Sequence, residues 1–221
     1  MNSAVIQLLV LAGIAIFLIL RLKSVLGTRD GFERPALPVA PEGAERPVPR
    51  LVTTQPGAKD EDITDHVPEG SPAAEALAAM KRVEQTFNVG DFLRGARGAY
   101  EMILMAFYRG ELDQVAPFLS SDVAAHFHEV IDSRKAQGLT VDATFIGIRE
   151  VALTEVAFEP SSRKAEVSVR FVAELTLVAR NAQGEAVEGS ADSIHRQKDV
   201  WTFTRTMGAA DPNWQLTATG E

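Results

Sequence analysis

Four side chains are candidates for acid–base chemistry, namely Tyr100, Glu174, His195 and Asp199. A carboxylate or an imidazole can catalyse proton transfer when it faces an apolar cavity, because its pKa then lies close enough to neutrality. Burial raises the pKa of a carboxyl group into that range, and the ordinary pKa of an imidazole is already near it. Glu174 occupies a polar position of an alternating strand, so we expect it to face solvent or a partner. His195 and Asp199 share their strand face with Trp201 and Phe203, so both could reach the rim of a pocket.

A structural role explains the same residues without catalysis. Arg170, Lys198 and Arg205 lie on the predicted strands and could pair with the acidic side chains in a salt-bridged sheet edge. Tyr100 belongs to the apolar stripe of a helix, where we expect a packed ring whose hydroxyl is hydrogen-bonded. The sequence favours this structural interpretation, so it predicts no catalytic residue and no enzyme.

The sequence offers no metal-binding pattern. His126 and His128 are two residues apart on a predicted helix, where their side chains point about 200° from each other and cannot chelate one ion together. The chain has no cysteine, which excludes Cys-based zinc sites, disulfides and thiol nucleophiles. It also carries no Gly-rich phosphate loop. We therefore predict neither a metal nor a cofactor.

Large apolar side chains could line a ligand pocket between helices and sheet. The candidates are Tyr100, Ile103, Phe107, Phe145, Phe171, Trp201, Phe203 and Trp214. A filled core is the more common outcome for such a set, but a curved sheet with aromatic residues on its concave side often leaves a cavity. Binding of a lipid, an acyl chain or another small ligand, or an isomerase- or hydrolase-like activity, is therefore the alternative to a purely structural core.

The elements that position these residues begin with helices. Apolar residues from Phe92 to Phe107 recur on one helical face, and Gly110 ends that helix. A short helix over residues 112–118 follows. Ser120 or Ser121 then caps a third helix.

The period changes to two in the last part of the chain. Between residues 165 and 179 every odd position is apolar, which indicates a strand with one buried face. Further strands are expected over residues 141–148, 151–158, 194–206 and 214–219. The order predicts an α+β domain, in which about three helices pack on one face of a curved antiparallel sheet.

A nearly unbroken apolar run over residues 4–20 predicts a membrane-spanning helix. Such a helix is ~25 Å long, near the lower limit for crossing a bilayer. Arg21, Lys23 and Arg29 follow the run, and positive charge holds that side of a membrane helix in the cytoplasm. We therefore expect residues 1–24 to be an uncleaved anchor, with the three basic residues able to touch anionic headgroups.

Composition divides the rest of the chain. Eight of the eleven prolines lie between residues 35 and 72, which predicts an acidic, disordered tether over residues 25–72. Residues 73–90 contain strong helix formers and are expected to form a lead-in helix before a folded domain over residues 91–221. The net charge of −8, without a stripe of basic residues, argues against nucleic acid as a partner.

The order of helices and strands resembles the cone-shaped fold of the nuclear-transport-factor-two and ketosteroid-isomerase superfamily. Within it, segments 92–103, 169–174, 199–205 and 211–216 are similar to signature segments of the Tim44-like domain family. In that family the domain forms the C-terminal part of the mitochondrial import-motor anchor subunit. A bacterial branch has the same plan of membrane helix, tether and C-terminal domain.

The resemblance implies a membrane-anchored adaptor that presents its domain to protein partners in translocation or membrane-associated assembly, with contact to anionic phospholipid. It further implies location at a bacterial inner membrane, with the domain on the cytoplasmic side. The tether is Pro-rich and short, without the long charged helical region through which the mitochondrial member engages the import channel and a chaperone. The resemblance therefore does not extend to chaperone recruitment.

Overall fold

The computed structural model describes residues 60–220. The predicted membrane anchor, its basic residues Arg21, Lys23 and Arg29, and the predicted tether as far as residue 59 lie outside this range. Within residues 60–220, no helix combines the length and the apolar character needed to cross a bilayer.

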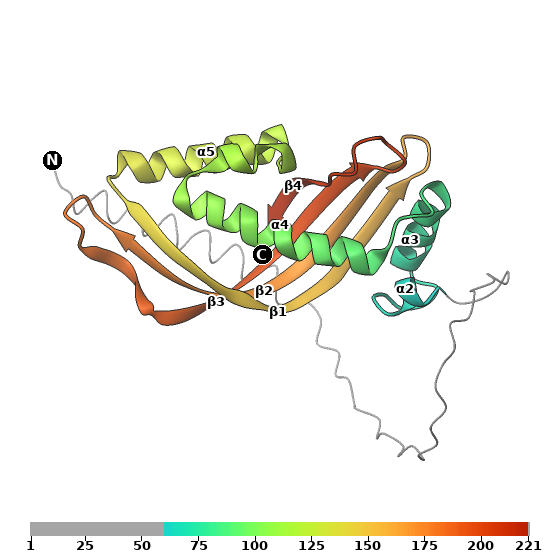
Figure 1. The fold of residues 1–221 in the computed structure, drawn as a ribbon, viewed down its shortest axis with the longest axis horizontal. Coiled ribbons are helices and arrows are strands. Elements are labelled where there is room, and N and C mark those ends of the chain that lie inside the picture. The colour runs from blue at the N-terminus through green and yellow to red at the C-terminus, as the bar shows by residue number, and fades with distance from the viewer. Residues whose placement is uncertain (1–59, 221) are drawn as a thin grey trace, which may run out of the picture. The chain divides into compact units, whose positions relative to one another are not determined.

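Four strands form one antiparallel sheet in the order β1-β2-β3-β4. Their bounds are β1 (Thr140–Glu159), β2 (Lys164–Arg180), β3 (Ala186–Thr206) and β4 (Gln215–Gly220). The buried face predicted for β2 is confirmed, because Val167, Val169 and Phe171 are each 0% exposed. The other face is less solvated than the alternation suggests, since Ser168, Val172, Glu174 and Val178 are buried as well. The predicted α+β class is confirmed for the described residues, since helices pack on one side of this sheet (Figure 1).

Two strands are longer than the sequence predicted. Residues 141–148 and 151–158 belong to the single 20-residue strand β1. Register shifts between Phe145 and Gly147, between Ile148 and Glu150, and further on in the strand interrupt its pairing with β2. Bulges of this kind bend a strand without ending it, which is how β1 follows the curved sheet. Strand β3 begins at Ala186 rather than near residue 194.

The helices are α3 (Pro72–Val83), α4 (Val89–Arg109) and α5 (Ser121–Ala136). Ser71 caps the N-terminus of α3, Asn88 that of α4 and Ser120 that of α5. Each side chain accepts a hydrogen bond from a backbone N–H group in the first turn of its helix. Gly110 ends α4 with a φ of 73°, a conformation that favours glycine. Two short 3-10 turns, η1 (Leu112–Gln114) and η2 (Ala116–Phe118), replace the predicted short helix. Figure 1 shows α4 and α5 on the concave side of the sheet.

The segment before α4 differs from its prediction. Residues 60–72, expected within the disordered tether, contain the helical turn α2 (Glu61–Thr64) and bury Ile63 and Val67. The lead-in helix ends at Val83 instead of residue 90. The physical reason is the Asp62 side chain, which accepts hydrogen bonds from the backbone N–H groups of Val89 (2.8 Å) and Gly90 (3.1 Å) and so attaches this segment to the start of α4.

Candidate functional site

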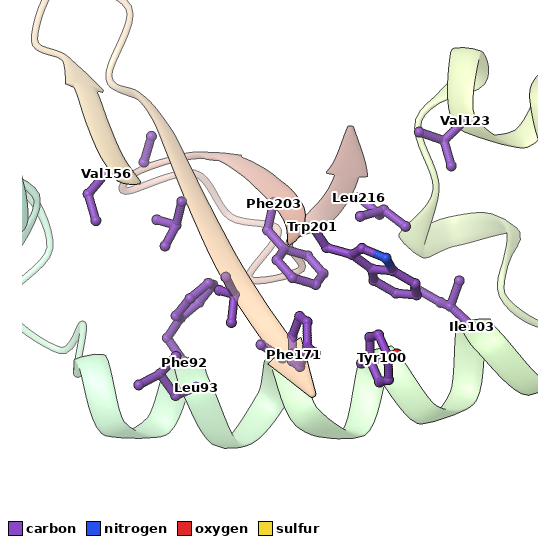
Figure 2. Packing of buried hydrophobic residues seen from close by; sticks show 14 of the residues in the cluster. Phe92, Leu93, Tyr100, Ile103, Val123, Val156, Phe171, Trp201, Phe203 and Leu216 are labelled. Atoms are coloured by element: carbon purple, nitrogen blue, oxygen red, sulfur yellow. The ribbon is translucent and has the colours of Figure 1, made fainter. Parts of the chain in front are cut away.

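The centre of the concave face is filled by side chains from the sequence-predicted pocket. Tyr100, Ile103 and Phe171 are 0% exposed, and Trp201 and Phe203 are almost as fully buried. The Tyr100 ring stacks on Phe171, with 4.4 Å between ring centroids, and lies 4.6 Å from the ring of Trp201. Figure 2 shows these residues of α4, β2 and β3 packed against one another. They occupy the space between helix and sheet.

The other predicted pocket residues lie around this centre. Phe145 is half-buried, and its ring centroid is 6.4 Å from that of Tyr100. Phe107 packs instead against Phe127 of α5, at 4.7 Å between centroids. Trp214 lies beyond the opposite end of the cluster, against Phe92 at 4.7 Å. Five of the eight candidates therefore belong to one buried core cluster, and Phe107, Phe145 and Trp214 are partly buried against it.

Asp199 is buried in this centre rather than at a rim. Its Oδ2 accepts a hydrogen bond from the Tyr100 hydroxyl at 2.5 Å and another from Nε2 of Gln197 at 2.9 Å. The Oε1 of Gln197 in turn accepts a hydrogen bond from the Tyr108 hydroxyl at 3.0 Å. Two tyrosines of α4 are thus joined to two polar side chains of β3.

The surroundings shift the proton affinities of these groups. Burial raises the pKa of Asp199, and the hydrogen bonds from Tyr100 and Gln197 only partly oppose that effect. Burial and the neighbouring Asp199 carboxylate raise the pKa of Tyr100 far above its usual value. Tyr100 is therefore a fixed hydrogen-bond donor, and Asp199 is a carboxylate that has no basic partner among residues 60–220.

Glu174 lies on the opposite, convex face of the sheet. It forms ion pairs with Arg149 of β1 (2.7 Å) and Arg196 of β3 (3.3 Å), one on each side of its strand. The hydrogen bond from Arg149 is the main reason that its pKa is lowered. The salt-bridged sheet edge predicted for Asp199 with Arg170, Lys198 and Arg205 does not form among the described residues, because Arg170 pairs with Glu150 and Arg205 pairs with Glu84.

The histidines are exposed. His195 lines a shallow cavity of about 210 Å³ together with Tyr108, Leu175 and Gln197. His126 and His128 lie on the exposed surface of α5. Within residues 60–220, no group of three or more histidine, aspartate or glutamate side chains is placed to hold a metal ion.

A second space, the Trp214 cavity, lies beside the aromatic centre and measures about 340 Å³. Its walls include Phe87, Phe92, Phe118, Phe203 and Trp214, and its floor is formed by Gly95, Ala96 and Ala99 of α4. The rings pack closely, with centroids 6.1 Å apart for both the Phe87–Trp214 and the Phe92–Phe203 pairs. Small residues on the helix opposite large rings leave this volume open.

An arginine–glutamate pair forms the polar wall of the Trp214 cavity. Arg205, with only 9% of its side chain exposed, pairs with Glu84 and donates a hydrogen bond to the carbonyl of Pro212. Burial opposes the ionisation of Glu84, but Arg205 and the N–H of Gly208 lower its pKa. The guanidinium carbon lies 5.6 Å from the centroid of the Trp214 ring. The buried Nε of Arg205 has no hydrogen-bond partner within the described part of the chain.

Sequence reasoning had not assigned Phe87, Glu84 or Arg205 to a ligand cavity. One local signal was available for Phe87, which precedes the cap residue Asn88 and faces Phe92, four residues into the helix, with 6.4 Å between their ring centroids. This arrangement is a hydrophobic staple, which fixes how the chain enters a helix. No comparable local signal connects Glu84 with Arg205, because they are 121 residues apart.

Comparisons with known proteins give the family. A family model described as Tim44-like domain matches residues 73–221. The chain is 28% identical over 147 residues to the human mitochondrial import inner membrane translocase subunit TIM44, covering 65% of this chain and 32% of that protein. The mouse protein of the same name is 26% identical over 147 residues, with the same coverage. The chain thus spans about a third of the length of these relatives.

One solved structure, the intermembrane space region of the chloroplast protein ARC6, aligns with a TM-score of 0.40 at 11% identity. That alignment covers 58% of this chain and 94% of the other, and a similarity this low supports no argument about fold or function. The family assignment rests on the sequence match, which includes α3, α4, α5 and all four strands. The chain belongs to the Tim44-like domain family.

Proposed function

We propose that this protein is a membrane-anchored, non-enzymatic adaptor that presents its Tim44-like domain to protein partners. In this proposal the domain lies on the cytoplasmic face of a bacterial inner membrane and serves translocation or membrane-associated assembly. Its relatives are named as subunits of a mitochondrial inner membrane translocase, which supports a role beside a membrane and a protein-conducting machinery.

The observation that carries the non-enzymatic part of the proposal is the filled centre of the concave face. A catalytic carboxylate would need to face space that a substrate can enter. Asp199 is instead only 8% exposed, and Tyr100 and Gln197 occupy its Oδ2 with hydrogen bonds. The exposed His195 lies in a shallow cavity that Gln197 also lines but Asp199 does not. This separation favours a structural role for both residues.

The membrane part of the proposal rests on the sequence before the described residues. The apolar run over residues 4–20 would supply the anchor, and Arg21, Lys23 and Arg29 would retain the following chain in the cytoplasm and contact anionic phospholipid. A reporter fused after Arg29 tests this topology. A reporter that works only in the cytoplasm should be active, and neutralising the three basic residues while adding positive charge before Ala4 should weaken or invert the orientation.

The adaptor role is tested by crosslinking the full-length protein in its own membrane and identifying the products by mass spectrometry. We expect crosslinks to membrane-associated proteins that map to the domain surface. Crosslinks confined to the protein itself, with no partner at any crosslinker length, would contradict the proposal.

A second candidate function is binding of a lipid or another small ligand. The observation in its favour is the Trp214 cavity, whose volume and aromatic walls are within the range of small-ligand sites. Extraction of the purified domain followed by mass spectrometry would detect a co-purifying lipid. A stoichiometric lipid that dissociates when the cavity is filled by mutation would favour this second function.

A further inference from the structure

We propose that the Trp214 cavity is the docking site for one bulky apolar side chain on an extended peptide segment of a protein partner, with a basic residue next to that side chain. This inference rests on the proposed adaptor function and specifies the chemistry of the partner. The cavity of about 340 Å³ is sized for a single anchor group rather than for a folded element. Interfaces commonly concentrate binding energy in one such aromatic-lined pocket.

The walls of the cavity favour an aromatic or branched aliphatic group. Phe87, Phe92 and Trp214 present ring faces and edges to the space, and rings pack well against other rings at these distances. The floor lacks side-chain bulk, because Gly95 has open space where a Cβ would be and Ala96 and Ala99 carry only a methyl group. An inserted side chain would therefore lie across the helix backbone and between the rings.

The polar wall favours a peptide over an anionic lipid. Arg205 is already neutralised by Glu84, so the cavity offers no free cation to a phosphate or a fatty-acid carboxylate. Asp91 adds a second carboxylate to the lining; it pairs with Arg94, but both side chains are largely exposed, and such an exposed pair is weak. The whole chain also carries a net charge of −8. Both features favour a basic residue next to the anchor and disfavour an acidic one.

The unpartnered Nε of Arg205 supplies an independent reason. A buried N–H without an acceptor is costly, and native structures rarely retain one. Arg205 lines the cavity, so the carbonyl oxygen of a bound peptide group is an acceptor that could serve this N–H. A peptide has carbonyl oxygens directly beside its apolar side chain, whereas an acyl chain has an acceptor only at its carboxyl or ester end, so this feature also favours a peptide.

The test uses the full-length protein in nanodiscs of phosphatidylcholine and a fluorescein-labelled probe peptide, Gly-Lys-Phe-Lys-Gly with a C-terminal amide. Fluorescence anisotropy measures the dissociation constant. We expect saturable binding, at least tenfold weaker binding when the Phe of the peptide is replaced by Ala, and weaker binding when both Lys are replaced by Glu. Raising the salt concentration should reduce the effect of the Lys-to-Glu exchange.

The chain provides a matched pair of variants for the same measurement. Gly95→Leu places a side chain in the Trp214 cavity, whereas Gly98→Leu changes an exposed glycine of the same helix that does not line it. Both replace a helical glycine, so both should keep or raise the melting temperature. We expect Gly95→Leu to weaken peptide binding at least tenfold and Gly98→Leu to change it less than twofold.

Three results would overturn the proposal. The first is the absence of saturable peptide binding up to millimolar concentration, and the second is an equal effect of Gly95→Leu and Gly98→Leu. The third is that the unaltered protein binds oleate but not the peptide, and that Gly95→Leu abolishes the oleate binding. This result would assign the cavity to a lipid.

Crosslinking in the native membrane separates this inference from the adaptor function. If Gly95→Leu and Gly98→Leu retain the same protein crosslinks, the adaptor proposal stands and the docking site is refuted. If Gly95→Leu alone loses the partner, both proposals are supported. If the unaltered chain crosslinks to no protein, the adaptor proposal itself fails.

Discussion

The Tyr100 hydroxyl donates a hydrogen bond to Oδ2 of Asp199 at 2.5 Å, and this contact joins α4 to β3 across 99 positions of the sequence. Both partners are buried, so neither can exchange the contact for water without opening the core. A buried polar pair of this kind fixes one orientation of the helix on the sheet, because any other orientation leaves a carboxylate without its donor.

Tyr100→Phe is expected to destabilise the domain by about 1–3 kcal/mol at pH 7, since it leaves the buried Asp199 with one donor fewer. Burial already raises the pKa of Asp199 above its ordinary value of 3.8, so the folded state loses stability as the pH rises through and above that value. Removing the Tyr100 donor raises this pKa further. The difference between variant and wild type should therefore grow from pH 4 to pH 7 in urea unfolding.

The control for this prediction is Asp199→Asn, which removes the titrating group and keeps an acceptor for Tyr100. In that background, Tyr100→Phe should cost less and its cost should not change with pH. An unchanged pH dependence after Asp199→Asn would show that another group is responsible.

Asp62 is expected to stabilise the domain by capping α4 from outside that helix. Asp62→Ala removes the acceptor for the N–H groups of Val89 and Gly90 and one ion-pair partner of Lys81, which should cost about 1–2 kcal/mol. Although burial opposes its ionisation, the hydrogen bonds from Lys81 and these N–H groups lower the pKa of Asp62. Its stabilising effect is therefore present above the unfolded pKa and lost as the pH falls through the lower folded pKa.

Chemical unfolding at pH 7 and at pH 3 checks this expectation, with Glu61→Ala as the control on the exposed side of the same turn. A truncated chain beginning at Ala73 should be less stable than one beginning at Thr54, because it also loses the burial of Ile63 and Val67. Equal stability of the two chains would mean that residues 60–72 do not contribute to folding.

Much of the fold follows from local patterns, whereas the burial of individual polar residues does not. The buried face of β2 and the cap at Ser120 are local properties, and the structure has both. Because side chains alternate between the two faces of a strand, the sequence of β3 predicts that Asp199 shares a face with Trp201. The alternation does not show whether a helix covers that position. The answer depends on Tyr100, which is 99 residues away and approaches only after the sheet curves.

The same limit applies to the start of the domain. Residues 60–72 are acidic and contain two prolines, a composition that is typical of disordered segments. A few contacts with distant residues nevertheless order this segment. Asp62 reaches Gly90 across 28 positions, and Ile63 is only 4% exposed. The average composition of a segment does not reveal the contacts of single residues such as Asp62 and Ile63. The tether predicted over residues 25–72 therefore included residues 60–72, which are ordered.

Gly189 is expected to be essential for the pairing of β2 with β3. It has a φ of +75°, and a Cβ at this position would lie 2.0 Å from the backbone oxygen of Leu177. Gly189→Ala should therefore cost more than the ~1–3 kcal/mol expected from a strained left-handed conformation alone. Gly184→Ala is the control, because φ is +81° there but no atom lies within 4 Å of an added Cβ. Equal losses in the two variants would mean that the backbone near Gly189 adapts without cost.

The two tryptophans separate a filled core from an open cavity. Trp201 is 3% exposed and touches Tyr100 and Phe171, so Trp201→Ala should cost about 3–5 kcal/mol, as expected for a large cavity in a packed core. Trp214 is only half-buried at the edge of the Trp214 cavity, so Trp214→Ala should cost about 1–2 kcal/mol and chiefly impair binding of the probe peptide. Denaturant unfolding and peptide anisotropy on the same samples measure both effects. A stable Trp201→Ala variant that had lost lipid binding would instead place an open ligand site in the centre of the concave face.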